Sequence, residues 1–155
     1  MPAPPVRTDE QWLLLAVEES RRCAPSATAF SVGTVVVDRS GRELARGHSR
    51  QGGDPRLHAE EAALAGFAAG DPRLAGATVY TSLEPCTERR SAERTCTELI
   101  VRSGAARVVL AWREPALLVA DCRGVELLAA SGLDVVEMPA LAASAAAVNA
   151  HLVGR

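Results

Sequence analysis

The chain has 155 residues and a mass of 16.3 kDa, which is the size of a single domain, and its 48% apolar and 23% charged residues exclude a disordered chain. Its formal net charge of -2 provides no general attraction for a phosphate backbone, so we expect no nucleic-acid polymer as a partner. The sequence shows neither an apolar signal segment nor a run of about 18 apolar residues, which predicts a cytoplasmic protein without contact with a membrane.

The first half of the chain predicts one helix, a β-hairpin and a second helix. Residues 1–7 are expected to form a flexible arm, and residues 8–155 a single domain. Thr8 or Asp9 can cap a helix that ends near the Cys23-Ala24-Pro25 segment. The β-branched run at 31–37 and its return at 43–47 are typical of a hairpin. A polar stretch then leads into a helix over 58–69.

The second half alternates strands and helices. Strands are predicted at 77–82, 107–112 and 133–137, and helices at 96–103, 124–131 and 141–152. Gly104 and Gly132 mark helix ends. Because strand-helix-strand units require parallel pairing whereas a hairpin is antiparallel, we expect a five-stranded mixed sheet. The fold class is therefore α/β, a three-layer α-β-α sandwich.

Three residues have the types and placement of zinc ligands. His58 opens a predicted helix, Cys86 follows a predicted strand, and Cys96 opens the next helix. Residues at the carboxyl ends of strands share one edge of an open sheet, where such proteins place their sites. Catalytic zinc commonly takes three protein ligands and leaves a fourth position to water, whose pKa it lowers. The sequence therefore predicts a catalytic Zn²⁺ site.

A metal-activated water needs a base beside it, and Glu60 stands two residues after His58. We predict that Glu60 is the general acid and base of the site and does not bind the metal. Cys23 and Cys122 have no partner at ligand spacing, and we expect both to be ordinary core or loop residues. His151 and Glu61 are assigned no role.

These motifs resemble those of the zinc-dependent nucleobase deaminases, which combine H-x-E with a later P-C-x-x-C. His58-Ala59-Glu60 and Pro85-Cys86 match that pattern, but nine residues separate Cys86 from Cys96. Within the cytidine and deoxycytidylate deaminase superfamily, this long loop is most similar to the pyrimidine deaminase domain of bacterial riboflavin biosynthesis, without its reductase domain. Segments in the same order extend the resemblance over about residues 10–150, namely Val32-Gly33, Gly47-His48, residues 76–80, Arg113-Glu114-Pro115 and residues 132–136.

The resemblance implies a hydrolytic deaminase with a cytidine-deaminase-like fold. Its substrate would be an amino-substituted pyrimidine, such as a ribosylamino-pyrimidinone 5′-phosphate, converted to the oxo form with release of ammonia. It also implies substrate contacts for His48, Ala59, Glu84 and Glu88, and a homodimer or tetramer. His48 has a second interpretation, as a residue that simply hydrogen-bonds the strand edge.

Three positions depart from the riboflavin-type pattern: Ala29 stands where the family has Asn, Glu88 replaces a His, and the loop between the cysteines is one residue longer. Glu88 would repel a substrate phosphate unless an arginine of the same loop compensates its charge, whereas it can accept hydrogen bonds from an unphosphorylated amino-heterocycle. The resemblance therefore leaves open whether a phosphate is recognised.

The same motifs allow three alternatives to a riboflavin-type deaminase. The first is a deaminase of another base or nucleoside, such as cytosine, cytidine or guanine. The second is a non-catalytic, zinc-stabilised binding module, against which the presence of Glu60 argues. The third is a polynucleotide-editing deaminase, which the acidic charge and the 3% aromatic content disfavour.

Overall fold

The computed structural model describes the chain except for residues 1, 4, 90–92, 117–121 and 154–155. Its described part contains a five-stranded sheet in the order β2-β1-β3-β4-β5. The strands are β1 (Gly33–Val37), β2 (Glu43–His48), β3 (Thr78–Thr81), β4 (Arg107–Leu110) and β5 (Asp134–Glu137). Strand β1 is antiparallel to β2 and β3, whereas β3, β4 and β5 are parallel. The predicted mixed sheet is confirmed.

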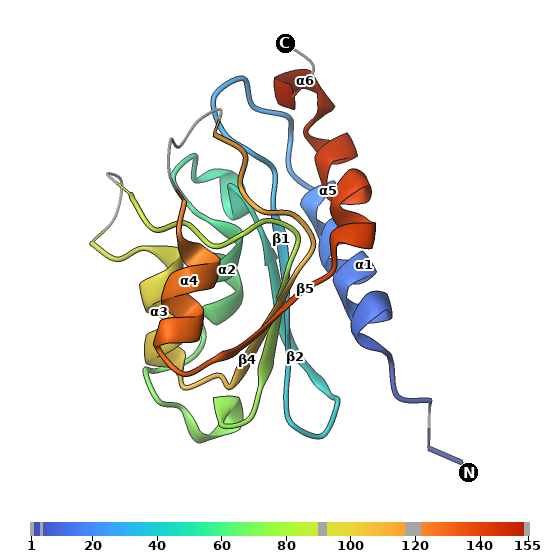
Figure 1. Ribbon diagram of the computed structural model, residues 1–155, viewed down its shortest axis with the longest axis vertical. Helices are drawn as coiled ribbons and strands as arrows, with labels where there is room; N and C mark the ends of the chain where they lie inside the picture. Colours follow the sequence, from blue (N-terminus) through green and yellow to red (C-terminus); the bar gives the residue numbers. More distant parts are fainter. Residues whose placement is uncertain (1, 4, 90–92, 117–121, 154–155) are drawn as a thin grey trace.

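Helices cover both faces of this sheet (Figure 1). One layer holds α1 (Asp9–Ser20) and α5 (Ala142–Val148), with the short α6 (Ala150–Val153) continuing from α5; the other holds α2 (Ala59–Leu64), α3 (Cys96–Ser103) and α4 (Gly124–Ala130). Short 3-10 turns lie at Gln51–Gly53, Pro72–Leu74 and Pro139–Leu141. The predicted three-layer sandwich is thereby confirmed.

The strands fill two cores through the alternation of their side chains. Val35 and Val37 of β1 pack with Trp12 and Leu13 of α1, whereas Val36 faces the opposite core with Ala63 and Leu64 of α2. The same division continues across β3 and β4. The central strands are therefore buried on both faces, and the helix that carries the predicted site residues packs directly against them.

Two helices differ from their prediction. The second helix ends at Leu64, because Gly66 follows and the Phe67 amide returns to the Leu64 carbonyl in a tight turn, 3.0 Å away. The C-terminal helix is divided at Asn149, where the Asn149 side chain hydrogen-bonds the backbone of Ser31. Its Oδ1 accepts from the Ser31 amide (2.7 Å) and its Nδ2 donates to the Ser31 carbonyl (3.1 Å).

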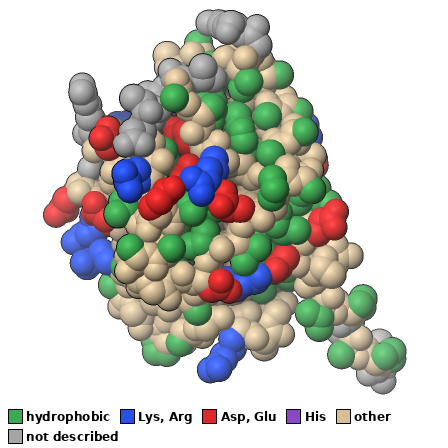
Figure 2. All heavy atoms as spheres, in the orientation of Figure 1, with side chains coloured by type: hydrophobic (Ala, Val, Ile, Leu, Met, Phe, Trp, Pro, Cys, Tyr) green, Lys and Arg blue, Asp and Glu red, His purple; other side chains and the backbone are tan. Residues whose placement is uncertain are grey.

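The surface over α4 and β5 carries acidic and basic side chains next to each other (Figure 2). Arg113 pairs there with Glu137 and Glu126, at 2.7 and 2.9 Å. The described residues of this face show no broad basic patch. None of the helices in the described part of the chain is long and apolar enough to cross a membrane.

Candidate metal centre and active-site cavity

The three predicted ligands come from the starts of two helices and from one loop. His58 is the residue that precedes α2, and its amide donates to the Glu61 carboxylate at 3.4 Å. Cys96 is the first residue of α3, a helix that Thr95 caps by accepting from the Glu98 amide. Cys86 lies in the loop between β3 and α3, and its sulfur accepts from the Cys96 amide at 3.3 Å. The starts of α2 and α3 and the loop between β3 and α3 therefore converge at one edge of the sheet.

The distances between the ligand atoms fit a tetrahedral zinc ion. His58 Nδ1 lies 3.7 Å from Cys86 Sγ and 3.3 Å from Cys96 Sγ, and all three ligand atoms lie within 4.8 Å of one another. Zn–N and Zn–S bonds of about 2.1 and 2.3 Å at tetrahedral angles place nitrogen and sulfur about 3.6 Å apart. The three side chains therefore fit Zn²⁺ with little movement.

The electrostatics of the cluster favour a metal. The hydrogen bond from the Cys96 thiol and the contact with His58 hold the pKa of Cys86 well below its ordinary value. Thiolates are the form in which cysteines bind metals, so Cys86 is ready as a ligand. Cys96 is fully buried, and its pKa is raised by its hydrogen bond to Cys86 and by burial. Bound zinc would have to displace that proton.

Glu60 lies beside the cluster and is only 4% exposed. Its Oε1 accepts a hydrogen bond from the Thr81 hydroxyl at 2.9 Å, which orients the carboxylate. Burial, and then the charge of Cys86, raise the pKa of Glu60 above its ordinary value. A carboxylate in this environment takes up a proton more readily than an exposed one, as a general base requires.

A cavity of about 350 Å³ opens in front of these residues, which is within the range of small-molecule sites. Three of the four predicted substrate contacts, Ala59, Glu84 and Glu88, line it. Its apolar walls include Phe30 and Leu83.

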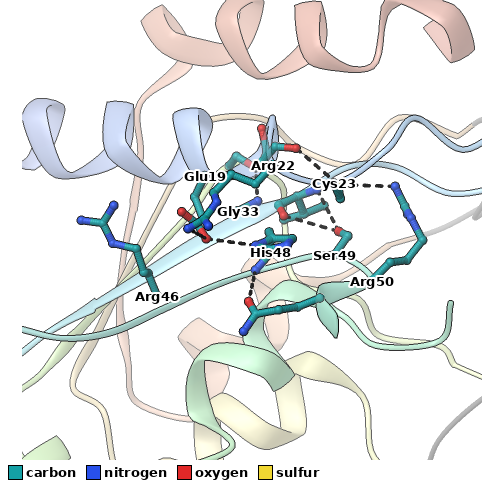
Figure 3. A network of polar contacts seen from close by, with 12 residues as sticks. Glu19, Arg22, Cys23, Gly33, Arg46, His48, Ser49 and Arg50 are labelled. Atoms are coloured by element: carbon teal, nitrogen blue, oxygen red, sulfur yellow. Dashed lines mark hydrogen bonds and ion pairs between the residues drawn. The ribbon is translucent and has the colours of Figure 1, made fainter. Parts of the chain in front are cut away.

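His48, the fourth predicted contact, is not among the residues that line this cavity. Its Nδ1 lies 3.0 Å from the Glu19 carboxylate of α1, and Figure 3 shows the ring directed at that side chain. The ring therefore bonds a side chain of α1 instead of the strand edge, and a substrate contact by His48 stays a prediction.

Glu84 has a supporting role in the cavity wall. Its two carboxylate oxygens accept from the backbone amides of Glu114 (3.1 Å) and Val125 (3.0 Å), which fixes the segment after β4. Glu114 itself lines the cavity, and burial raises its pKa to about 7. Sequence reasoning gave no role to Glu114, although the Arg113-Glu114-Pro115 segment had been noted in the resemblance.

Two arginines that line the cavity also had no predicted site role of their own. The Arg89 side chain is 3% exposed, and its Nη2 contacts the Glu61 carboxylate at 2.8 Å. It thereby connects the loop between the cysteines to the helix that follows His58. Arg50 comes from the end of β2. Arg89, Arg90 and Arg94 are the arginines of this loop that could compensate the charge of Glu88; Arg90 lies outside the described residues, and Arg94 is not among the residues that line this cavity.

Cys23 and Cys122 stay outside the metal cluster, as expected. The Cys23 thiol donates to the Ser20 carbonyl and the Cys122 thiol to the Pro85 carbonyl, both at 3.4 Å. His151 hydrogen-bonds the Ser26 carbonyl at 2.7 Å. Among the described residues, His58, Cys86 and Cys96 are the group of three that could hold a metal ion.

A His/Cys/Cys site with a neighbouring glutamate is the arrangement found in the zinc-dependent nucleobase deaminases. The sequence profile of the family described as "Cytidine and deoxycytidylate deaminase zinc-binding region" matches residues 6–112, and the chain belongs to this family.

Individual relatives agree with this assignment. The chain is 39% identical over 130 residues to the diaminohydroxyphosphoribosylamino-pyrimidine deaminase of Schizosaccharomyces pombe, covering 83% of this chain and 31% of that protein. It is 41% identical over 105 residues to the riboflavin biosynthesis protein RibD of Aquifex aeolicus, covering 68% and 27%. The chain thus spans about a third or less of the length of these two relatives.

A solved structure from Thermotoga maritima is also similar. It is a diaminohydroxyphosphoribosylaminopyrimidine deaminase/5-amino-6-(5-phosphoribosylamino)uracil reductase, and it superimposes with a TM-score of 0.75 at 28% identity. The match covers 94% of this chain and 41% of that one. The predicted similarity to deaminases of riboflavin biosynthesis is confirmed.

Proposed function

We propose that the chain is a zinc-dependent hydrolytic deaminase of an amino-substituted pyrimidine, acting in riboflavin biosynthesis. The observation that carries the proposal is the convergence of His58, Cys86 and Cys96 beside the buried Glu60, at the wall of a cavity of about 350 Å³. The names of the relatives support the pyrimidine substrate. Assembly into a homodimer or tetramer and a cytoplasmic location stay predictions.

The ligand set selects zinc over harder cations, because two thiolates and one imidazole are typical zinc ligands. When bound, zinc supplies a polarised water as the nucleophile. His58 would bind through Nδ1, the ring atom that faces both sulfurs. A fourth position would be left for water, as in catalytic rather than structural zinc sites.

Glu60 moves the protons in this proposal. Thr81 donates to Oε1 and so orients the carboxylate, which takes a proton from the attacking water. The same carboxylate then returns protons to the ring nitrogen and to the departing amine, which leaves as ammonia. The apolar walls formed by Phe30 and Leu83 would exclude other water from the ring.

The test is an ammonia-release assay with the purified, zinc-loaded protein. The panel contains diaminohydroxyphosphoribosylamino-pyrimidine, cytosine, cytidine and guanine. Ammonia released from the first compound at a higher kcat/KM than from the others supports the proposal. Preference for another ring reassigns the substrate. Stoichiometric zinc without release from any ring would identify a non-catalytic zinc module and overturn the proposal.

A further inference from the structure

One wall of the cavity is formed by the loop between α1 and β1. Four residues of this loop line the cavity, namely Thr28, Ala29, Phe30 and Val32. Residues 26–32 belong to no helix or strand. Within the described part of the chain, no hydrogen bond joins the backbone of residues 26–31 to another backbone group. Because buried backbone groups need partners, side chains from neighbouring elements must supply them here. The position of this wall therefore depends on those side chains.

Asn149, the residue between α5 and α6, holds this loop at Ser31. Its Oδ1 accepts from the Ser31 amide at 2.7 Å, and its Nδ2 donates to the Ser31 carbonyl at 3.1 Å. The same Nδ2 donates to the Ala145 carbonyl of α5 at 3.3 Å. Asn149 is 1% exposed and Ser31 is 3% exposed, so loss of either partner would leave buried polar groups without a hydrogen bond. Phe30 and Val32, the neighbours of Ser31 in the chain, are both cavity residues.

Two residues of α6 contact the same wall, next to which this short helix lies (Figure 1). His151 Nε2 lies 2.7 Å from the Ser26 carbonyl oxygen, at the other end of the loop. Leu152 packs into a buried cluster with four cavity-lining residues, namely Phe30, Val32, Ala59 and Leu83. Leu152 is not itself among the residues that line the cavity, so it lies behind the wall. Asn149, His151 and Leu152 therefore hold both ends and the middle of the loop from one side.

The metal ligands and the loop are positioned by different elements. The ligands come from the starts of α2 and α3 and from the loop after β3, whereas residues 26–32 precede β1. Phe30 also contacts Trp112 edge to face, with ring centroids 5.6 Å apart. A shift of residues 26–32 would therefore change the apolar wall around the substrate ring and leave the metal cluster in place.

We propose that Asn149 is a positioning residue for substrate binding, which sets the place of Phe30 and Val32 through its two bonds to Ser31. His151 assists it through the Ser26 carbonyl. The proposal rests on the proposed function and adds that the C-terminal segment α5–α6 determines how tightly the substrate ring is bound. Asn149 does not line the cavity, so it acts through the loop and is not a catalytic residue.

The competing explanation is that Asn149 only attaches the C-terminal helices to the domain. Loss of an attachment would lower the free energy of unfolding and leave KM unchanged. Loss of positioning would raise KM with little change in kcat, because a wall contact binds the ground state and the transition state alike. The two explanations are therefore separated by measuring KM and kcat in variants that are also compared for stability.

The experiment compares zinc-loaded wild type, Asn149→Ala and the control Val108→Ala, with diaminohydroxyphosphoribosylamino-pyrimidine as the substrate. Val108 of β4 is fully buried in the core on the other face of the sheet and does not line the cavity, so its truncation lowers stability away from the wall. Asn149→Ala is expected to raise KM about 5- to 20-fold, with kcat within about threefold and unchanged zinc content. In Val108→Ala, KM should stay within about twofold although Tm falls. An unchanged KM in Asn149→Ala, or an equal rise in Val108→Ala, would overturn the proposal.

His151 provides a milder change that decides the question if Asn149→Ala does not fold. It is half-buried, and its bond to the Ser26 carbonyl is a single contact. His151→Ala is expected to raise KM about three- to fivefold. His151→Gln should restore a KM close to that of wild type, because the glutamine amide can donate to the same carbonyl. The same KM in wild type, His151→Ala and His151→Gln would contradict positioning by this segment.

Hydrogen exchange of peptides covering residues 26–32, read by mass spectrometry, tests the proposal without catalysis. The Ser31 amide, which donates to Asn149, should exchange at least tenfold faster in Asn149→Ala than in wild type or Val108→Ala. Equal exchange in all three proteins would refute the positioning even if deamination is found. If no substrate is deaminated but this exchange depends on Asn149, the proposed function fails while the positioning of the cavity wall stands.

Discussion

Replacing Glu60 by Gln tests the proposed proton transfer with the smallest change in shape. The side chain is 4% exposed, and its Oε1 accepts from Thr81 at 2.9 Å, a bond that the amide oxygen of glutamine can also accept. General acid–base catalysis contributes about 10²- to 10⁴-fold, equivalent to about 3–5 kcal/mol of transition-state stabilisation. We expect kcat to fall by that factor. Zinc content should be unchanged, because Glu60 is not among the three clustered ligands.

Stability separates a catalytic loss from a structural one. Burial raises the pKa of Glu60, which means that the buried carboxylate charge lowers the free energy of unfolding. A neutral amide removes this penalty, so the Tm of Glu60→Gln should equal or exceed that of wild type. The matched control is Glu98→Gln, an exposed carboxylate in the first turn of α3. Ammonia release, zinc analysis and thermal melts are measured together. Wild-type activity in Glu60→Gln, or loss of its zinc, would refute the proposed role.

Three further changes test the metal and the fold. Cys96→Ala should bind less zinc and melt at a lower temperature, because zinc binding also stabilises the fold; zinc content and Tm equal to wild type would contradict this. Asp9→Asn breaks the pair with Arg107, which should cost about 1 kcal/mol in urea unfolding at neutral pH. Hydrogen bonds from Arg107 lower the pKa of Asp9. The extra stability of wild type over Asp9→Asn should therefore disappear as the pH falls from about 4 through that lowered pKa. A stability difference that does not change over this pH range would refute the pairing. Gly47→Ala would place a Cβ 2.6 Å from the backbone nitrogen of Ala63 and should lower the free energy of unfolding by about 1–3 kcal/mol. Gly66→Ala is the control, because a Cβ there meets open space and should cause no such loss.

Local signals in the sequence were sufficient for most of the elements. Thr8 caps α1 with the side-chain bond that its residue type predicts, and Gly104 and Gly132 adopt positive φ at helix ends. The bounds of α3 agree with the predicted helix over 96–103. In these cases the residue that stops or starts an element is adjacent to it, so a local pattern contains the information.

The division of the C-terminal helix came from a contact that is distant in the sequence. Asn149 divides the C-terminal helix because its side chain pairs with Ser31, 118 residues away. No local pattern in an alanine-rich segment indicates such a partner. The His58, Cys86 and Cys96 cluster also joins distant residues, but there the chemistry of metal binding revealed the partnership, because zinc requires several ligands of a few residue types.

The direction of the His48 side chain follows from strand geometry. Neighbouring residues of a strand point to opposite faces of the sheet. A Cβ on Gly47 would meet Ala59 and Ala63 of α2, so the next residue, His48, faces α1, where its ring meets Glu19. The alternation was available from the sequence, but the face that α2 covers was not. A prediction of the cavity lining needed both.

The carboxylates around the cavity are distinguished by their hydrogen bonds more than by their positions in the motif. Glu84 accepts from the amide of Glu114 with one oxygen and from the amide of Val125 with the other. A carboxylate held in this way positions the segment after β4. Glu60 accepts one side-chain hydroxyl and stands two residues from a metal ligand. Glu60 therefore lies where a proton can pass to and from a metal-bound water, and Glu84 holds part of the cavity wall in place.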